Sequence, residues 1–163
     1  CRGVLCRRQC LMGMRIAMFE PEIAGNVGAV LRLGACMGAG IDLIEPLGFT
    51  WDDRRVRRAA MDYIDEVEIT RHSDFDAFSA GLGERRLILF TTKSTRSAYD
   101  FAFRADDVLL FGKESAGVPE HVAAASHAMV RLPMRAEVRS LNVATSAAIA
   151  LAEALRQTGT LPR

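Results

Sequence analysis

Three separated segments of the chain contain polar side chains of the types that orient a substrate. The segments are 20–32, with Asn26 and Arg32; 111–119, with Glu114; and 133–142, with Arg139, Ser140 and Asn142. Amides, carboxylates and hydroxyls form directional hydrogen bonds, and a guanidinium pairs well with a phosphate. This set of side chains indicates a site that positions a substrate, and the arginines favour a phosphate in that substrate.

Common nucleotide-binding and hydrolase motifs are absent. The residues Phe111-Gly112-Lys113-Glu114 resemble part of a P-loop, but that motif needs glycine at position 107 and serine or threonine at position 114, where Asp107 and Glu114 stand. The glycines between 25 and 40 contain no G-x-G-x-x-G, and the chain contains no G-x-S-x-G. An ATPase, a nicotinamide-dependent dehydrogenase and a serine hydrolase are therefore poorly supported.

The cysteines and histidines do not indicate a metal site. The three N-terminal cysteines have no C-x-x-C spacing and no histidine nearby; they are Cys1, Cys6 and Cys10. Cys36 falls in an apolar helical pattern, which favours a place in the core. The histidines are interpreted as surface residues; they are His72, His121 and His127. We expect no bound metal.

Residues 1–13 differ from the rest of the chain. They hold three of the four cysteines and three arginines, without the apolar stretch of ~7–15 residues that a signal peptide needs. We interpret them as a disordered or non-native extension before Met14, and we expect a cytoplasmic protein without a membrane span. Without them the formal charge falls from +1 to −2, with 18 basic and 20 acidic residues. Any contact with nucleic acid must then be a local basic patch.

Strand and helix patterns alternate along the remaining sequence. Strands are predicted at 15–19, 41–45, 67–70, 87–91, 108–111 and 129–132. Helices are predicted at 25–37, from 51 onward, at 74–78, at 120–125 and at 141–157. This alternation predicts one α/β domain with a mostly parallel sheet and helices on both faces.

The predicted sheet explains how the three polar segments come together. The runs at 87–91 and 108–111 are continuously apolar, which is typical of parallel strands buried on both faces. In such sheets ligands bind beyond the carboxyl ends of the strands. The segments 20–32, 111–119 and 133–142 all follow predicted strands, so we expect them to share one edge of the sheet.

The three segments closely resemble the signature motifs of the SPOUT methyltransferases, the SpoU/TrmH superfamily. The matching residues are Glu20-Pro21-Glu22 with Asn26-x-Gly28 and Arg32; Phe111-Gly112-x-Glu114-x-x-Gly117-x-Pro119; and Arg131-Leu132-Pro133-Met134 with Arg139-Ser140-Leu141-Asn142. The likeness covers residues 14–158. The segment 44–63, which includes Trp51-Asp52-Asp53 and Arg57-Arg58, resembles the subfamily that methylates the wobble nucleotide of tRNA.

The resemblance implies a fold and an activity that the general rules would not predict. Residues 14–158 would form a single methyltransferase domain, with a trefoil knot over roughly 111–156, although knots are nearly absent from proteins. The enzyme would use S-adenosylmethionine (SAM) to methylate the ribose 2′-hydroxyl of nucleotide 34, a cytidine or modified uridine, in tRNA-Leu isoacceptors. It would bind the anticodon stem-loop and act as a homodimer, with part of the RNA site supplied across the interface.

The resemblance also assigns roles to individual residues. Those expected to bind the cofactor are Phe90, Thr91, Gly112, Gly117, Leu132, Met134, Ser140 and Leu141. The expected catalytic residues are Asn26, Arg32, Glu114, Ser140 and Asn142. Arg32 is a poor base because its pKa lies above about 12, so orienting a phosphate suits it better than accepting a proton. The residues expected to contact RNA are Arg32, Arg54, Arg55, Arg57, Arg58 and Arg139.

Several alternatives stay open at the level of sequence. Phe90 and Leu132 fit a core position as well, and Asn26 and Ser140 fit helix N-caps. The arginines between 54 and 58 fit a solvated helix face. The enzyme fits another tRNA position or ribosomal RNA as its target, and a catalytically silent RNA-binding protein would have the same fold.

Overall fold

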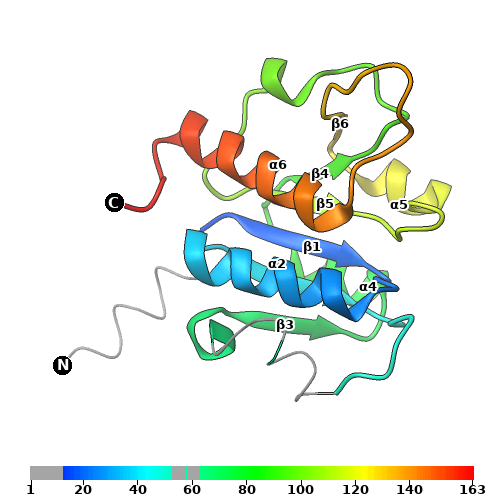
Figure 1. Cartoon of the computed structure of the whole chain (residues 1–163), viewed down its shortest axis with the longest axis vertical. Helices are drawn as coiled ribbons and strands as arrows, with labels where there is room; N and C mark the ends of the chain where they lie inside the picture. The colour runs from blue at the N-terminus through cyan, green and yellow to red at the C-terminus, as the bar shows by residue number, and fades with distance from the viewer. Residues whose placement is uncertain (1–12, 53–57, 59–62) are drawn as a thin grey trace.

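A six-stranded parallel β-sheet runs through the residues that this computed structural model describes, which are 13–52, 58 and 63–163 (Figure 1). The strands are β1 (Arg15–Phe19), β2 (Gly40–Ile44), β3 (Ile69–His72), β4 (Leu87–Phe90), β5 (Val108–Phe111) and β6 (Ala128–Val130). Their order is β3-β2-β1-β5-β4-β6, and each neighbouring pair is parallel. The α/β prediction is confirmed.

Helices cover both faces of this sheet, as predicted. They are α2 (Ala24–Met37), α4 (Phe75–Gly81), α5 (Glu120–Ala125) and α6 (Val143–Thr158), with 3-10 turns η1 (Tyr63–Glu66) and η2 (Ala98–Asp100). Neighbouring residues of a strand point to opposite faces, so Ile16 packs in the cluster with α2 and α6, and Ala17 in the cluster with α4 and α5. Figure 1 shows α2 and α6 lying near each other over β1 and β5.

Most predicted bounds agree with the structure to within two residues. The strand predicted at 67–70 is found two residues later, at Ile69–His72. Its last three residues, Thr70 to His72, are polar and form hydrogen bonds with side chains in or directly after other strands. A search for apolar strand patterns therefore does not extend the strand to Arg71 and His72. The helix predicted from 51 onward falls mostly outside the described residues. No helix in the described part of the chain combines the length and the apolar character that a membrane span requires.

Two single-residue predictions are wrong. Cys36 is exposed on α2 rather than buried in the core. His72 is half-buried rather than on the surface, because its Nε2 lies 2.8 Å from Oδ1 of the buried Asp42. Asp42 also accepts from the Arg15 guanidinium, with Nε at 2.6 Å. A buried charged side chain needs a partner, and here Asp42 is the partner of both Arg15 and His72.

Asp107 holds together the turn that leads into β5. Its side chain is fully buried and accepts from Arg86 Nε at 2.8 Å and Nη2 at 2.7 Å, and from the Arg104 backbone N–H at 2.8 Å. Its backbone carbonyl accepts from the Arg15 N–H, so the turn is also joined to β1.

We predict that Asp107→Ala lowers the free energy of unfolding by about 3 kcal/mol, because it removes the carboxylate partner of the partly buried Arg86 guanidinium and the acceptor of the Arg104 N–H. Urea denaturation followed by circular dichroism measures this. Glu137→Ala is the matched control, since Glu137 pairs with Arg135 on the exposed surface and should change little. Equal losses in the two variants would contradict the importance of the buried pair.

Candidate functional site

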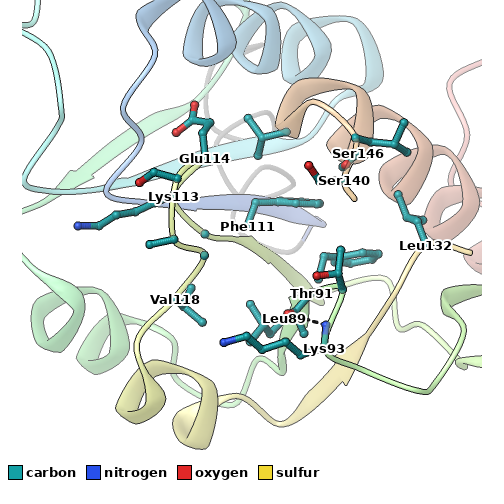
Figure 2. Close-up of a pocket in the computed structure, with 18 of the residues that line it drawn as sticks. Leu89, Thr91, Lys93, Phe111, Lys113, Glu114, Val118, Leu132, Ser140 and Ser146 are labelled. Carbon is teal, nitrogen blue, oxygen red and sulfur yellow. Dashed lines mark hydrogen bonds between the residues drawn. The ribbon is translucent and has the colours of Figure 1, made fainter. Parts of the chain in front are cut away.

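The three polar segments meet in an open pocket of about 840 Å³ at the carboxyl ends of β4, β5 and β6. Residues from all three segments line it, including Asn26, Glu114 and Ser140. Figure 2 shows Lys113 and Glu114 on one side, Leu132 on the other and Phe111 between them. The volume is in the range of small-molecule and cofactor sites. The predicted convergence is therefore confirmed.

Aromatic rings form the apolar part of this pocket. Phe90 and Phe111, at the ends of neighbouring strands, stack with ring centroids 5.0 Å apart and planes 18° apart. Phe103 continues the stack behind Phe90, at 6.2 Å. Phe90 and Leu132 are each 9% exposed, so they belong to the core and also line the pocket. A flat apolar ligand group fits such a surface.

A tight turn closes the pocket after β5. Lys113 and Gly117 exchange two backbone hydrogen bonds of 2.9 Å, and Gly117 has a φ of 70°, which favours glycine. A Cβ on Gly112 would lie 2.4 Å from the carbonyl carbon of Gly117, so only glycine fits there. The turn therefore needs glycine at both positions for its own conformation, and the backbone of both glycines lines the pocket.

Three side chains from the three segments form one hydrogen-bonded bridge. Asn26 Nδ2 donates to Glu114 Oε1 at 2.8 Å, and Asn142 Nδ2 donates to Asn26 Oδ1 at 2.9 Å. Asn26 is 8% exposed, so these bonds replace bonds to water. The bridge joins residues that lie 88 and 116 positions apart in the sequence.

The helix-cap alternatives are wrong for Asn26 and Ser140. Asn26 lies inside α2, whose N-cap is Ile23. Its side chain bonds to the other two segments and not to the start of its own helix. The residue that caps α6 is Asn142, whose Oδ1 accepts from the N–H groups of Ala144 at 2.9 Å and Thr145 at 3.2 Å. Ser140 lies before the helix and lines the pocket.

The other cofactor residues predicted from the sequence also line the pocket. They are Thr91, Gly112, Gly117, Met134 and Leu141. Lining residues that the sequence did not single out include Ile23, Lys93, Val118, Ala123, Met129, Val143 and Ser146. They come from strand ends, loops and helix starts, where a single apolar, lysine or serine residue gives no signal before the fold is known.

The described members of the predicted RNA-contacting arginines do not line the pocket. Arg32 is exposed on α2, with its guanidinium 5.7 Å from the Tyr63 ring centre, and it does not line the pocket. Arg58 and Arg139 are exposed. The other three arginines lie outside the described residues; they are Arg54, Arg55 and Arg57. Within the described residues no group of three or more His, Cys, Asp or Glu could hold a metal.

Comparisons with known proteins agree with this geometry. A family model described as the SpoU rRNA Methylase family matches residues 13–152. The tRNA (cytidine(34)-2′-O)-methyltransferase of Beijerinckia indica subsp. indica is 51% identical over 150 residues, which cover 91% of this chain and 94% of that protein.

Solved structures are similar as well. One that concerns 2-OH methylation of C/U34 on tRNA has a TM-score of 0.85 and 38% identity, and the match covers 90% of this chain and 96% of that one. The AdoMet-bound rRNA methyltransferase of Sinorhizobium meliloti has a TM-score of 0.79 and 26% identity, covering 88% of this chain and 56% of that one.

We predict that Gly112→Ala lowers the free energy of unfolding by about 1–3 kcal/mol, because the added methyl group collides with backbone that cannot move without opening the turn. Urea denaturation is the measurement. Gly25→Ala is the matched control, since a Cβ there meets no atom within 4 Å and alanine favours the helix. The prediction fails if Gly112→Ala is as stable as this control.

Proposed function

The chain belongs to the SpoU rRNA Methylase family, and on that basis we propose that it methylates the ribose 2′-hydroxyl of nucleotide 34 in tRNA, a cytidine or a modified uridine. The observation that carries this function is the meeting of the three signature segments in one pocket. The near relatives share the name tRNA (cytidine(34)-2′-O)-methyltransferase. The protein is therefore an enzyme, a methyltransferase acting on tRNA.

We propose SAM as the methyl donor, bound in the pocket described above. SAM supplies a methyl group that is already activated by its sulfonium. The residues present fit this cofactor, because the backbone of Gly112 and Gly117 lines the pocket and Phe90 and Leu132 offer an apolar surface. The main-chain groups of these three residues would hold the cofactor, with Thr91, Gly117 and Met134 around them and Ser140 and Leu141 closing the pocket.

We propose that Glu114 and Asn142 brace the site rather than accept the proton of the ribose. Both oxygens of Glu114 already accept hydrogen bonds, one from the Glu22 N–H at 2.9 Å and one from Asn26. Asn142 uses its oxygen for the α6 cap and its nitrogen for Asn26. Ser140 is exposed in the pocket and is left to hydrogen-bond the target nucleotide.

We propose that Arg32 acts on the nucleotide bound to the other protomer of a homodimer. Arg32 lies on an exposed part of α2 and outside the lining of its own pocket, which supports a role across an interface. A guanidinium is a poor base but binds a phosphate with paired hydrogen bonds. Orienting the nucleotide by its phosphate places the 2′-hydroxyl, and such positioning contributes a large part of a transfer reaction.

We propose that the anticodon stem-loop lies along exposed basic residues, of which Arg139 is next to the pocket. Arg139 directly precedes Ser140 and is exposed, and Arg58 belongs to the arginine-rich segment 54–58. The chain from Met14 onward carries more acidic than basic residues, so phosphate binding has to rely on such local groups. We also propose tRNA-Leu isoacceptors as substrates and the cytoplasm as the place of reaction.

We propose that residues from about 111 to 156 form a trefoil knot. The connection between β4 and β5 contacts the end of β6, where the Ala98 N–H donates to the Arg131 carbonyl at 2.8 Å. It also contacts the far end of α6, where the Phe103 N–H donates to Gln157 at 3.2 Å. After the edge strand β6, the chain turns back and packs on β5 as helix α6. On this path it passes the connection between β4 and β5, which is the loop that the knot requires the chain to thread.

Mass spectrometry of methylated tRNA tests the proposed reaction. Purified protein is incubated with SAM and unmodified tRNA, and nuclease fragments are sequenced by their masses. We expect one methyl group on the ribose of nucleotide 34. Methylation of a base, of another nucleotide or only of ribosomal RNA would contradict the proposal.

We predict that Arg32→Ala lowers kcat on the order of 100-fold, because the ribose is no longer held in line for transfer, while SAM affinity stays nearly unchanged. Methyl-transfer kinetics and calorimetry with SAM give the two values. Arg156→Ala is the matched control, since Arg156 pairs with Glu153 at the end of α6 away from the pocket. Normal turnover of Arg32→Ala would remove this residue from the mechanism.

A further inference from the structure

We propose that Glu22 is a positioning residue, which holds the turn at 113–117 in the conformation that the cofactor needs. This inference rests on the proposed function, because it names SAM as the ligand of the pocket. Glu22 is absent from the residues to which the sequence assigned a role. It does not line the pocket itself, whereas the residues of the turn do.

Two residues of the segment 20–22, Glu20 and Glu22, bind the first half of the turn. Glu20 forms an ion pair with Lys113 at 2.5 Å. The Glu22 N–H donates to Glu114 Oε2 at 2.9 Å, and the Glu22 carboxylate accepts from Ser115 twice, from its N–H at 2.9 Å and its Oγ at 2.8 Å. Three consecutive residues of the turn are thus joined to a segment more than 90 positions earlier in the chain.

The charges of these groups agree with the contacts. The two hydrogen bonds from Ser115, helped by the nearby Lys113, lower the pKa of Glu22. The hydrogen bond to Glu20 raises the pKa of Lys113. Glu22 therefore stays ionised, and Lys113 stays protonated, at the neutral pH where tRNA is modified.

The segment that carries Glu22 is itself held firmly by the sheet. The Glu20 N–H donates to the Ile44 carbonyl at 2.9 Å, and the Pro21 carbonyl accepts from the Gly48 N–H at 2.9 Å. Glu20 has a φ of 44°, an uncommon value for a residue with a side chain, which neighbouring structure has to maintain. A Cβ on Gly48 would lie 2.7 Å from Glu22 Cα, so the loop after β2 also packs closely here.

The turn, by contrast, has little support of its own. Ser115, Ala116 and Gly117 are exposed, and the internal backbone bonds of the turn are the two between Lys113 and Gly117. On one side of the turn Gly112 faces the cofactor, and within it Glu114 supports Asn26. Glu22 thus joins a firmly held segment to a weakly held one, at the place where the backbone meets the cofactor.

Calorimetric titration with SAM tests this role in the full chain. We expect Glu22→Ala to raise the dissociation constant about tenfold, less than the full loss of two hydrogen bonds to a charged group, because these bonds are exposed to water and act on the cofactor only through the turn. Glu22→Gln should stay within about twofold of the unmodified protein, since its amide can accept from the Ser115 N–H and donate to Oγ. Glu45→Ala is the matched control, because it removes a glutamate ion pair with Arg71 away from the turn.

A double-mutant cycle with Ser115→Ala separates positioning from general loss of stability. If both residues act through one contact, Glu22→Ala with Ser115→Ala should bind SAM as weakly as Glu22→Ala alone. If the two substitutions act independently, so that their factors in the dissociation constant multiply in the double variant, the proposal is overturned. A lower unfolding midpoint with unchanged SAM affinity would also overturn it, since this indicates a merely structural role.

The two proposals fail in different ways. If the unmodified protein does not bind SAM, the proposed function fails first. If the unmodified protein binds SAM and Glu22→Ala binds it equally well, the function stands and the role of Glu22 is rejected. If Glu22→Ala does not fold, Glu22→Gln and Ser115→Ala still decide, because the first should bind normally and the second about threefold more weakly.

Discussion

The hydrogen-bonded bridge from Glu114 through Asn26 to Asn142 is the interaction on which the site depends. It joins the three segments that the parallel sheet brings to one edge, and it does so with a nearly buried amide in the middle. A buried amide without partners would cost free energy, so each of the three side chains holds the others in place. The pocket is the space that this bridge encloses together with the stacked Phe90 and Phe111.

The sequence predicted the sheet and the location of the site well, for physical reasons. Continuous apolar runs such as 108–111 occur where both faces of a strand are covered, and ligands bind where parallel strands end. Glycines and polar residues that follow such strands are therefore expected at the same edge of the sheet, where the strands have their carboxyl ends. The resemblance to a known family then supplied the residue roles and the reaction, which periodicity does not contain.

Other features could not be predicted, because they depend on distances between residues far apart in the sequence. Asn26 has the properties of a helix cap, and its actual role needs Glu114 beside it. His72 has polar neighbours in the sequence, but its buried partner is on another strand. The place of Arg32 outside the pocket, and the paired contacts of Glu22, likewise follow from packing alone.

The double role of Asn142 couples the start of a helix to the closure of the pocket. Its oxygen caps α6, and its nitrogen completes the bridge to Asn26. Fraying of the first turn of α6 would therefore remove one partner of a buried amide, and loss of the bridge would release the side chain that caps the helix. Order at the start of α6 and affinity for a ligand in the pocket are thus expected to rise and fall together.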